Sequence, residues 1–220
     1  ISLGYAPFDK GVHDFTYQDM NGKSNPASLK ATELARKGRL VCVAAGNYGS
    51  QAWHYITCPA DADSILTVGS CRKDSTHAPS SCYGPSSDGR IKPDITAWGE
   101  QTHYLNMNDG TMGTGNGTSY ACPEIAGMAA CLWQALPDKT AMEIRDLILQ
   151  SGSQHAHPDN TMGHGIPNAY QAYLLGKGTP SKVETNETDT PEKVTKILYR
   201  GEILILRNGS QYDLTGHKKG

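Results

Sequence analysis

The feature that most constrains the fold is a glycine-rich run, 113–123, that leads through Gly-Thr-Ser into an apolar segment. This pattern predicts a helix over 118–136 with Ser119 at its N-terminus. Unpaired backbone N–H groups and the helix dipole stabilise negative charge at such a terminus. A serine nucleophile needs that stabilisation, because acyl transfer builds an oxyanion beside it. A serine there can also be a simple helix cap. We expect Pro123 in the first turn, where its missing N–H costs little.

The rest of the chain alternates short apolar runs with helical segments. We expect strands over 1–4, 39–45, 65–70 and 94–97, and further helices over 27–37, 140–151 and 168–175. Gly38 and Gly176 are placed to end two of these helices, and Thr140 with Glu143 forms a capping box. The alternation predicts an α/β layer fold with a mostly parallel sheet.

Composition narrows the function classes. The 220 residues suffice for one core and a small appendage, and the net charge of −2 gives no electrostatic argument for nucleic acid or an anionic membrane. No apolar run approaches the roughly 18 residues that a transmembrane helix needs. The six cysteines could form disulfides outside the cytosol, but small buried free thiols are the favoured interpretation.

Several segments carry a family resemblance. The segment 117–127 reads Gly-Thr-Ser-Tyr-Ala-Cys-Pro-Glu-Ile-Ala-Gly and resembles the catalytic-serine signature of the subtilisin-like proteases. The segments 41–47, 59–69 and 80–97 are similar to three more of that family's elements, in the family's order. Asn116, Pro79 and Trp98 depart from the usual residues. The resemblance covers 1–176 and implies a three-layer subtilisin-like α/β fold whose N-terminal half is missing.

The resemblance also implies a reaction, hydrolysis of peptide bonds by a serine endopeptidase. Ser119 is then the nucleophile that forms the acyl-enzyme, and Asn47 donates a side-chain N–H to the oxyanion. Taken alone, Asn47 could equally be a turn residue that tolerates a positive φ.

Substrate contacts follow from the same resemblance. Ser2, Leu3 and Gly4 look like the strand that pairs with an extended protein or peptide substrate. Ala44, Ala45 and Gly46 look like the wall of the pocket for the residue before the cut. The small wall residues favour a roomy pocket.

The general base and its orienting carboxylate are missing. Neither Asp-[Ser/Thr]-Gly nor His-Gly-Thr occurs before Ser119. His164 resembles a packing residue, His54 a surface or loop-packing residue, and His155 with His157 a solvated turn rather than a metal site. We expect the base and carboxylate upstream of Ile1, so that the 220-residue fragment alone is inactive. The alternative is a surface-exposed, non-catalytic binding or adhesion protein, a pseudoprotease on the same fold.

Cofactors are not expected. Structural calcium often accompanies the family, but the sequence has no dense acidic cluster. Asp61 and Asp63 alternate in a predicted loop, and we expect both to be solvated.

The C-terminal region changes character. Residues 177–195 are charged and rich in Thr and Pro, which predicts a linker. Residues 196–220 hold two β runs, 196–200 and 203–207, and a tight turn at Asn208-Gly209. This region resembles the C-terminal sorting tail of type IX secretion substrates in Bacteroidetes. It implies a contact with the secretion machinery and a secreted or cell-surface, outer-membrane-associated protein. The alternative is a small β appendage.

Overall fold

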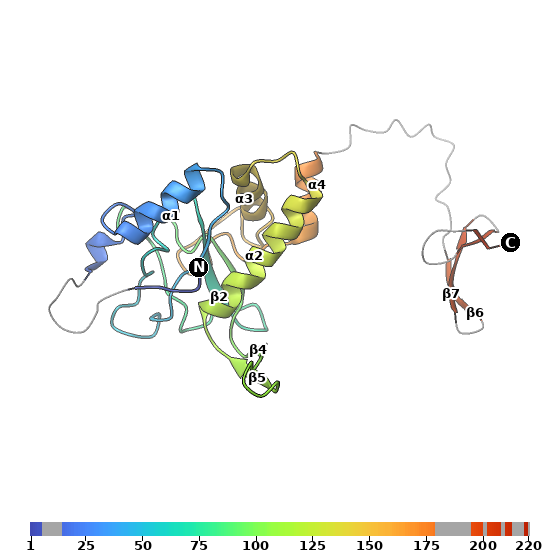
Figure 1. The fold of residues 1–220 in the computed structure, drawn as a ribbon, viewed down its shortest axis with the longest axis horizontal. Coiled ribbons are helices and arrows are strands. Elements are labelled where there is room, and N and C mark those ends of the chain that lie inside the picture. Colours follow the sequence, from blue (N-terminus) through green and yellow to red (C-terminus); the bar gives the residue numbers. More distant parts are fainter. Residues whose placement is uncertain (6–14, 179–194, 200–201, 208–209, 213–217, 220) are drawn as a thin grey trace. The chain divides into compact units, whose positions relative to one another are not determined.

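The computed structural model describes residues 1–5, 15–178, 195–199, 202–207, 210–212 and 218–219. The chain divides into two compact units, Ile1–Gly178 and Thr179–Gly220. The first unit holds the helices and the parallel sheet, and the second holds a separate small sheet (Figure 1).

A parallel sheet forms the centre of the first unit. Its strands are β1 (Cys42–Ala44), β2 (Leu66–Cys71) and β3 (Ile95–Trp98), in that order across the sheet. Side chains alternate along the strands, so that Cys42 and Ala44 face one core while Val43 and Ala45 face the other. A parallel sheet buried on both faces needs a helical layer on each side.

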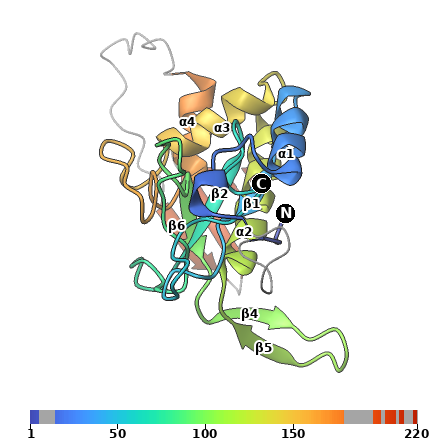
Figure 2. The ribbon, with the colours of Figure 1, turned by 90° about the vertical axis from the view of Figure 1, so that its left-hand side faces the viewer.

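Helices supply those two layers (Figures 1 and 2). Ala31 and Ala35 of α1 (Pro26–Arg36) pack into the core on one face of the sheet. The other face packs against α2 (Thr118–Ala135), α3 (Ala141–Gln150) and α4 (Ala169–Lys177). The expected three-layer α/β fold with a parallel sheet is therefore confirmed.

The first residues differ from the prediction. No strand spans 1–4, and only Ile1 pairs with the sheet edge. Its amino group donates to the Cys42 carbonyl at 2.6 Å, and its carbonyl accepts from Ala44 N–H at 3.0 Å. Farther along, Tyr5 and Cys58 form an isolated antiparallel bridge. The predicted strand 39–45 likewise shortens to β1.

Most helix ends coincide with a capping residue. Asn25 caps α1 with Pro26 at its first position, and the capping box of Thr140 and Glu143 at α3 is confirmed. Gly176 does not end α4, which runs to Lys177. A Cβ on Gly176 would overlap the side chain of Leu136, so this glycine lets α4 pack closely.

A β-hairpin precedes α2 in a region where the sequence predicted no strand. It consists of β4 (Thr102–Leu105) and β5 (Met112–Gly115) and projects from the body of the first unit (Figure 2). The Tyr104 ring lies beside Tyr120, with centroids 5.8 Å apart. The glycine-rich run therefore starts as a strand that ends three residues before α2.

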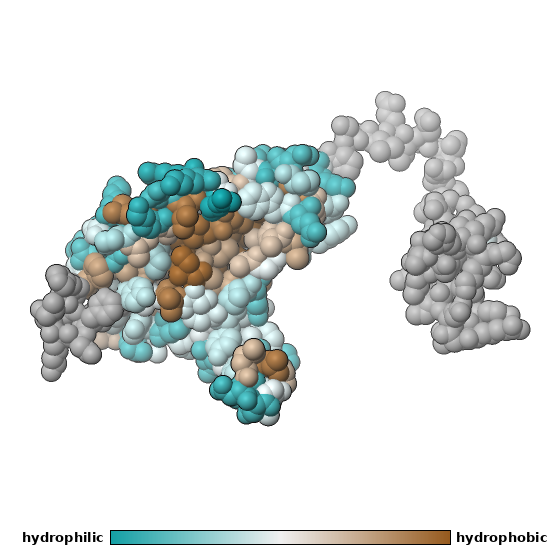
Figure 3. Space-filling model, viewed as in Figure 1, coloured by the Kyte–Doolittle hydropathy of each residue, from teal (hydrophilic) through white to brown (hydrophobic). Residues whose placement is uncertain are grey.

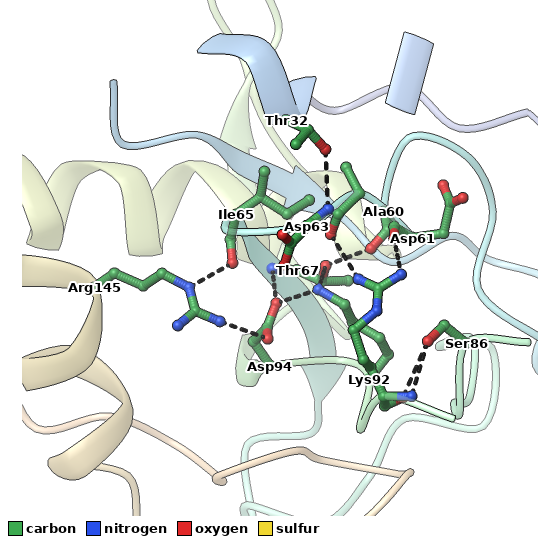
Figure 4. A network of polar contacts seen from close by, with 12 residues as sticks. Thr32, Ala60, Asp61, Asp63, Ile65, Thr67, Ser86, Lys92, Asp94 and Arg145 are labelled. Atoms are coloured by element: carbon green, nitrogen blue, oxygen red, sulfur yellow. Dashed lines mark hydrogen bonds and ion pairs between the residues drawn. The ribbon is translucent and has the colours of Figure 1, made fainter. Parts of the chain in front are cut away.

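A buried ion network joins the sheet to α3 (Figure 4). Asp94 Oδ2 accepts from Lys92 Nζ and from Thr67 N–H, each at 2.7 Å. Arg145 donates to Asp94 Oδ1 at 3.2 Å and to the Ile65 carbonyl at 2.8 Å. One carboxylate thus links β2, the start of β3 and α3.

Asp61 corrects a prediction. It is fully buried rather than solvated, because its carboxylate accepts from Gly22 N–H at 2.7 Å and from the Ser28 hydroxyl at 2.5 Å. Both donors come from more than thirty residues earlier in the chain, so local composition gives no sign of them. Asp63 is exposed, as expected.

The second unit is an antiparallel sheet. Its strands β6 (Thr195–Tyr199), β7 (Glu202–Arg207), β8 (Ser210–Tyr212) and β9 (Lys218–Lys219) are neighbours in chain order. The two predicted β runs are confirmed as strands. Most of the predicted linker, 179–194, and the predicted turn at 208–209 lie outside the described residues.

Candidate functional site

The start of α2 depends on a glycine. Gly117 is the N-cap residue, with φ +146°, a conformation that L side chains rarely adopt. Its N–H donates to the Gly99 carbonyl at 2.7 Å. A Cβ there would lie 3.2 Å from Asn47 Nδ2, so Gly117 also leaves room for that amide.

Asn47 is hydrogen-bonded to Thr118, the residue before Ser119. Its Oδ1 accepts from Thr118 N–H at 2.8 Å and from the Thr118 hydroxyl at 3.0 Å. Because a backbone N–H can only donate, this contact fixes which amide atom is the oxygen. Asn47 Nδ2 donates to no acceptor in the part of the chain that the structure describes, and Asn47 is exposed. A fixed N–H donor therefore remains available at the surface.

Ser119 is half-buried at the second position of α2. Its Oγ donates to the Ser2 carbonyl at 3.2 Å, and the Ser2 hydroxyl donates to the Ser119 carbonyl at 3.3 Å. Pro123 lies in the second turn of α2, not in the first as predicted. Its missing N–H leaves the Ser119 carbonyl without the usual i+4 donor, and the Ser2 hydroxyl takes that place.

A pocket of about 320 Å³ opens beside Ser119 and Asn47. Ser2, Leu3 and Gly4 line one side, and Ala44 and Gly46 line the other. The structure thus brings together all but one of the predicted site residues.

Ala45 is the exception. Its side chain is fully buried in the core on the α1 side of the sheet, because successive side chains of an extended segment point to opposite faces. Its backbone still contributes, since the Ala45 carbonyl accepts from Thr57 N–H at 3.1 Å.

Several residues at the site were missed from the sequence, among them Tyr48, Gln51 and Thr118, which also line the pocket. Thr57 lines the pocket. Cys82 lies beneath the loop that carries Asn47. Its N–H donates to the Gly46 carbonyl at 3.0 Å and its Sγ accepts from Tyr48 N–H at 3.2 Å. Burial raises the pKa of the Cys82 thiol to about 12, so it packs as a neutral group. No local pattern marks Thr57 or Cys82.

No described histidine contacts Ser119. His54 stacks on Tyr83 at 4.1 Å and contacts the Gly49 carbonyl through Nδ1 at 2.9 Å, which makes it a loop-packing residue. The Nδ1 atoms of His155 and His164 lie 2.8 Å apart. Burial, followed by the proximity of His155, lowers the pKa of His164.

Three further observations concern the described residues alone. All six cysteines, including the exposed Cys131, are free thiols. No group of three or more His, Cys, Asp or Glu side chains among these residues could hold a metal ion. None of their helices is both long and apolar enough to cross a membrane.

Comparison with known proteins identifies the family. Residues 1–165 match the subtilase family. Serine protease AprX of Bacillus subtilis (strain 168) is 31% identical over 168 residues, which cover 67% of this chain and 38% of AprX. Subtilisin-like protease PopC of Myxococcus xanthus (strain DK1622) is 36% identical over 156 residues, covering 69% and 31%.

The solved structures agree. The self-cleaved protease domain of PatA is 25% identical, with a TM-score of 0.58 over 81% of this chain and 61% of the PatA chain. The matched part of the chain spans less than two fifths of the length of AprX and of PopC. Since the family match covers most of the chain and includes both Asn47 and Ser119, this protein belongs to the subtilase family.

Proposed function

We propose that the complete protein is a subtilisin-like serine endopeptidase. Ser119 attacks the scissile carbonyl and forms the acyl-enzyme. Asn47 Nδ2 and the Ser119 N–H stabilise the oxyanion. The observation that carries this proposal is the bond between Thr118 N–H and Asn47 Oδ1, which leaves the amide N–H of Asn47 unpaired on a residue that lines the same pocket as Ser119. The N–H at the second helix position has no intrahelical acceptor.

The base and its carboxylate come, in this proposal, from residues upstream of Ile1. The chain covers only 61% of the PatA chain. An apolar groove of about 380 Å³ also lies open at the sheet edge between α1 and α2 (Figure 3). Ile1, Leu34 and Trp133 are among its lining residues. We propose that the upstream part of the peptidase domain covers this groove and places a histidine beside Ser119 Oγ.

Substrate binds as an extended chain. We propose that the backbone at Ser2, Leu3 and Gly4 pairs with it, and that Ala44 and Gly46, with the Ala45 backbone, bound the pocket for the side chain before the cut. Leu3 is 63% exposed, which leaves this edge accessible. Protein or peptide substrates fit such recognition, since backbone pairing reads extended conformation more than sequence.

Substitutions of Asn47 test the proposal in the complete protein. Asn47→Asp keeps an acceptor for Thr118 N–H but has no N–H to donate, whereas Asn47→Ala loses both. We expect both to lower kcat by about 10²- to 10³-fold, because each removes one oxyanion donor. Only Asn47→Ala should lower the melting temperature. An Asn47→Asp variant with unchanged kcat would show that Asn47 is structural.

Ser119→Ala supplies the second test. It should abolish labelling by a fluorophosphonate probe, and persistent labelling would place the nucleophile elsewhere. If the wild-type protein is neither labelled nor active, and its upstream sequence lacks the Asp and His motifs, the non-catalytic binding protein becomes the better description.

We further propose that residues 1–176 are peptidase domain, 177–195 a linker and 196–220 a sorting tail read by secretion machinery. The separate antiparallel sheet of the second unit supports an independent element. Deleting 196–220 should leave peptidase activity unchanged and retain the protein inside the cell. Normal surface display of the deletion variant would contradict the sorting role.

A further inference from the structure

Thr57 closes the space between the two pocket walls. Its Oγ1 is the nearest neighbour of both wall glycines, Gly4 and Gly46. A Cβ on Gly4 would overlap Thr57 Oγ1, and a Cβ on Gly46 would lie 2.8 Å from it. The hydroxyl therefore touches both backbones and forms the floor of the pocket. The volume of about 320 Å³ is shared with Ser119 and Asn47, which line the same pocket.

This floor is fixed in place. Thr57 is fully buried, and its N–H and Oγ1 both donate to the Ala45 carbonyl, at 3.1 and 3.4 Å. The next residue, Cys58, exchanges two backbone hydrogen bonds with Tyr5, at 2.8 and 3.1 Å. The β-branched side chain has few rotamers, so the floor cannot swing aside for a larger group.

The residues that line the pocket also disfavour a charged substrate side chain. None of the described residues that border this pocket is Lys, Arg, His, Asp or Glu. A charged substrate side chain would be desolvated there without an ionic partner, which is strongly unfavourable.

We infer that the pocket accepts a small uncharged side chain, such as that of Gly, Ala or Ser, on the substrate residue that supplies the scissile carbonyl. The inference rests on the proposed peptidase function and adds its specificity. It differs from the roomy pocket that the small wall residues alone predict, because Thr57 occupies the space that Gly4 and Gly46 leave open.

The experiment compares peptide p-nitroanilides with Ala, Ser, Leu, Phe or Lys before the cleaved bond, using the complete protein. We expect kcat/KM for Ala to exceed that for Phe at least tenfold, since a pocket discriminates by about 10- to 200-fold per methylene. Thr57→Gly should raise the Phe-to-Ala ratio by about 10- to 200-fold. Thr57→Val is the matched control. It keeps the volume of the floor and should keep the preference for Ala.

Two results would overturn the inference. One is a wild-type protein that cleaves the Phe or Lys substrate as well as the Ala substrate. The other is an unchanged ratio in Thr57→Gly, or in Thr57→Ala if the glycine variant does not fold. If the wild-type protein cleaves no peptide and Ser119 is not labelled by a fluorophosphonate, the proposed function itself fails. Cleavage with the wrong preference refutes only the specificity.

Discussion

Replacing Asp94 by alanine should destabilise the fold by about 3–5 kcal/mol, the range observed when one partner of a buried ion pair is removed. Lys92 shows why the loss is large. Its side chain is only 3% exposed, and without Asp94 the described part of the chain leaves its ammonium only the Thr67 hydroxyl, at 2.9 Å. The Thr67 N–H also loses its acceptor, and an unsatisfied buried donor costs about 1–3 kcal/mol. The two losses share one site, so they do not simply add.

The assay is urea unfolding of the complete protein in a Ser119→Ala background, which prevents self-digestion. The matched control is Lys92→Met combined with Asp94→Asn, which removes both charges while an amide oxygen can still accept from Thr67 N–H. We expect this double variant to lose less stability than Asp94→Ala alone. The reasoning is refuted if Asp94→Ala costs under about 1 kcal/mol, or if the double variant is the less stable of the two.

The Asp94 carboxylate also makes the stability of the fold depend on pH. Burial alone would raise the pKa of Asp94, but the charges of Lys92 and Arg145 outweigh it and lower the pKa. The unfolded chain then binds the proton more readily than the folded protein. The contribution of Asp94 is therefore complete above the unfolded pKa of about 3.9 and is lost as the pH falls through the folded pKa. The stability difference between wild type and Asp94→Ala should shrink below about pH 4.

Three further predictions concern other parts of the first unit. Thr140→Ala removes the capping box of α3 and should cost about 0.5–2 kcal/mol of stability in the same urea assay; no loss would mean that packing alone holds this helix end. Gly117→Ala places a Cβ 3.2 Å from Asn47 Nδ2 at a φ of +146°, so peptidase activity should fall even where the variant stays folded by circular dichroism. In the native protein iodoacetamide should modify Cys131 first, because the other five thiols are buried; peptide mass spectrometry that finds another site modified equally fast contradicts this.

The helices and the sheet class were predictable because their signals are local. Asn25, Thr140 and Asn168 each cap a helix with their own side chain, which accepts from a backbone N–H two or three residues farther along the chain. Gly176 carries the same kind of signal and misled the prediction. Its real role is a contact with Leu136, forty residues away, which no local rule contains.

The candidate site likewise combines residues that the sequence predicts with residues that only the fold brings together. The family resemblance predicts Ser119 and Asn47 as neighbours at one site, and the same pocket contains both. The floor at Thr57 and the support from Cys82 were missed, because each depends on backbone that only the fold brings close. Asp61 was misjudged for the same reason, since both of its hydrogen-bond donors lie far along the chain.

The link between Asn47 and Thr118 has a mechanical consequence. It joins the turn that carries Asn47 to the first residue of α2, which lies 71 residues farther along the chain, and both residues line the pocket. The bond therefore couples the position of the Asn47 amide to that of Ser119, the next residue of α2. The opposite wall meets Ser119 only through longer contacts from Ser2, at 3.2 and 3.3 Å. The alignment of Asn47 with Ser119 is therefore set independently of the contacts from Ser2.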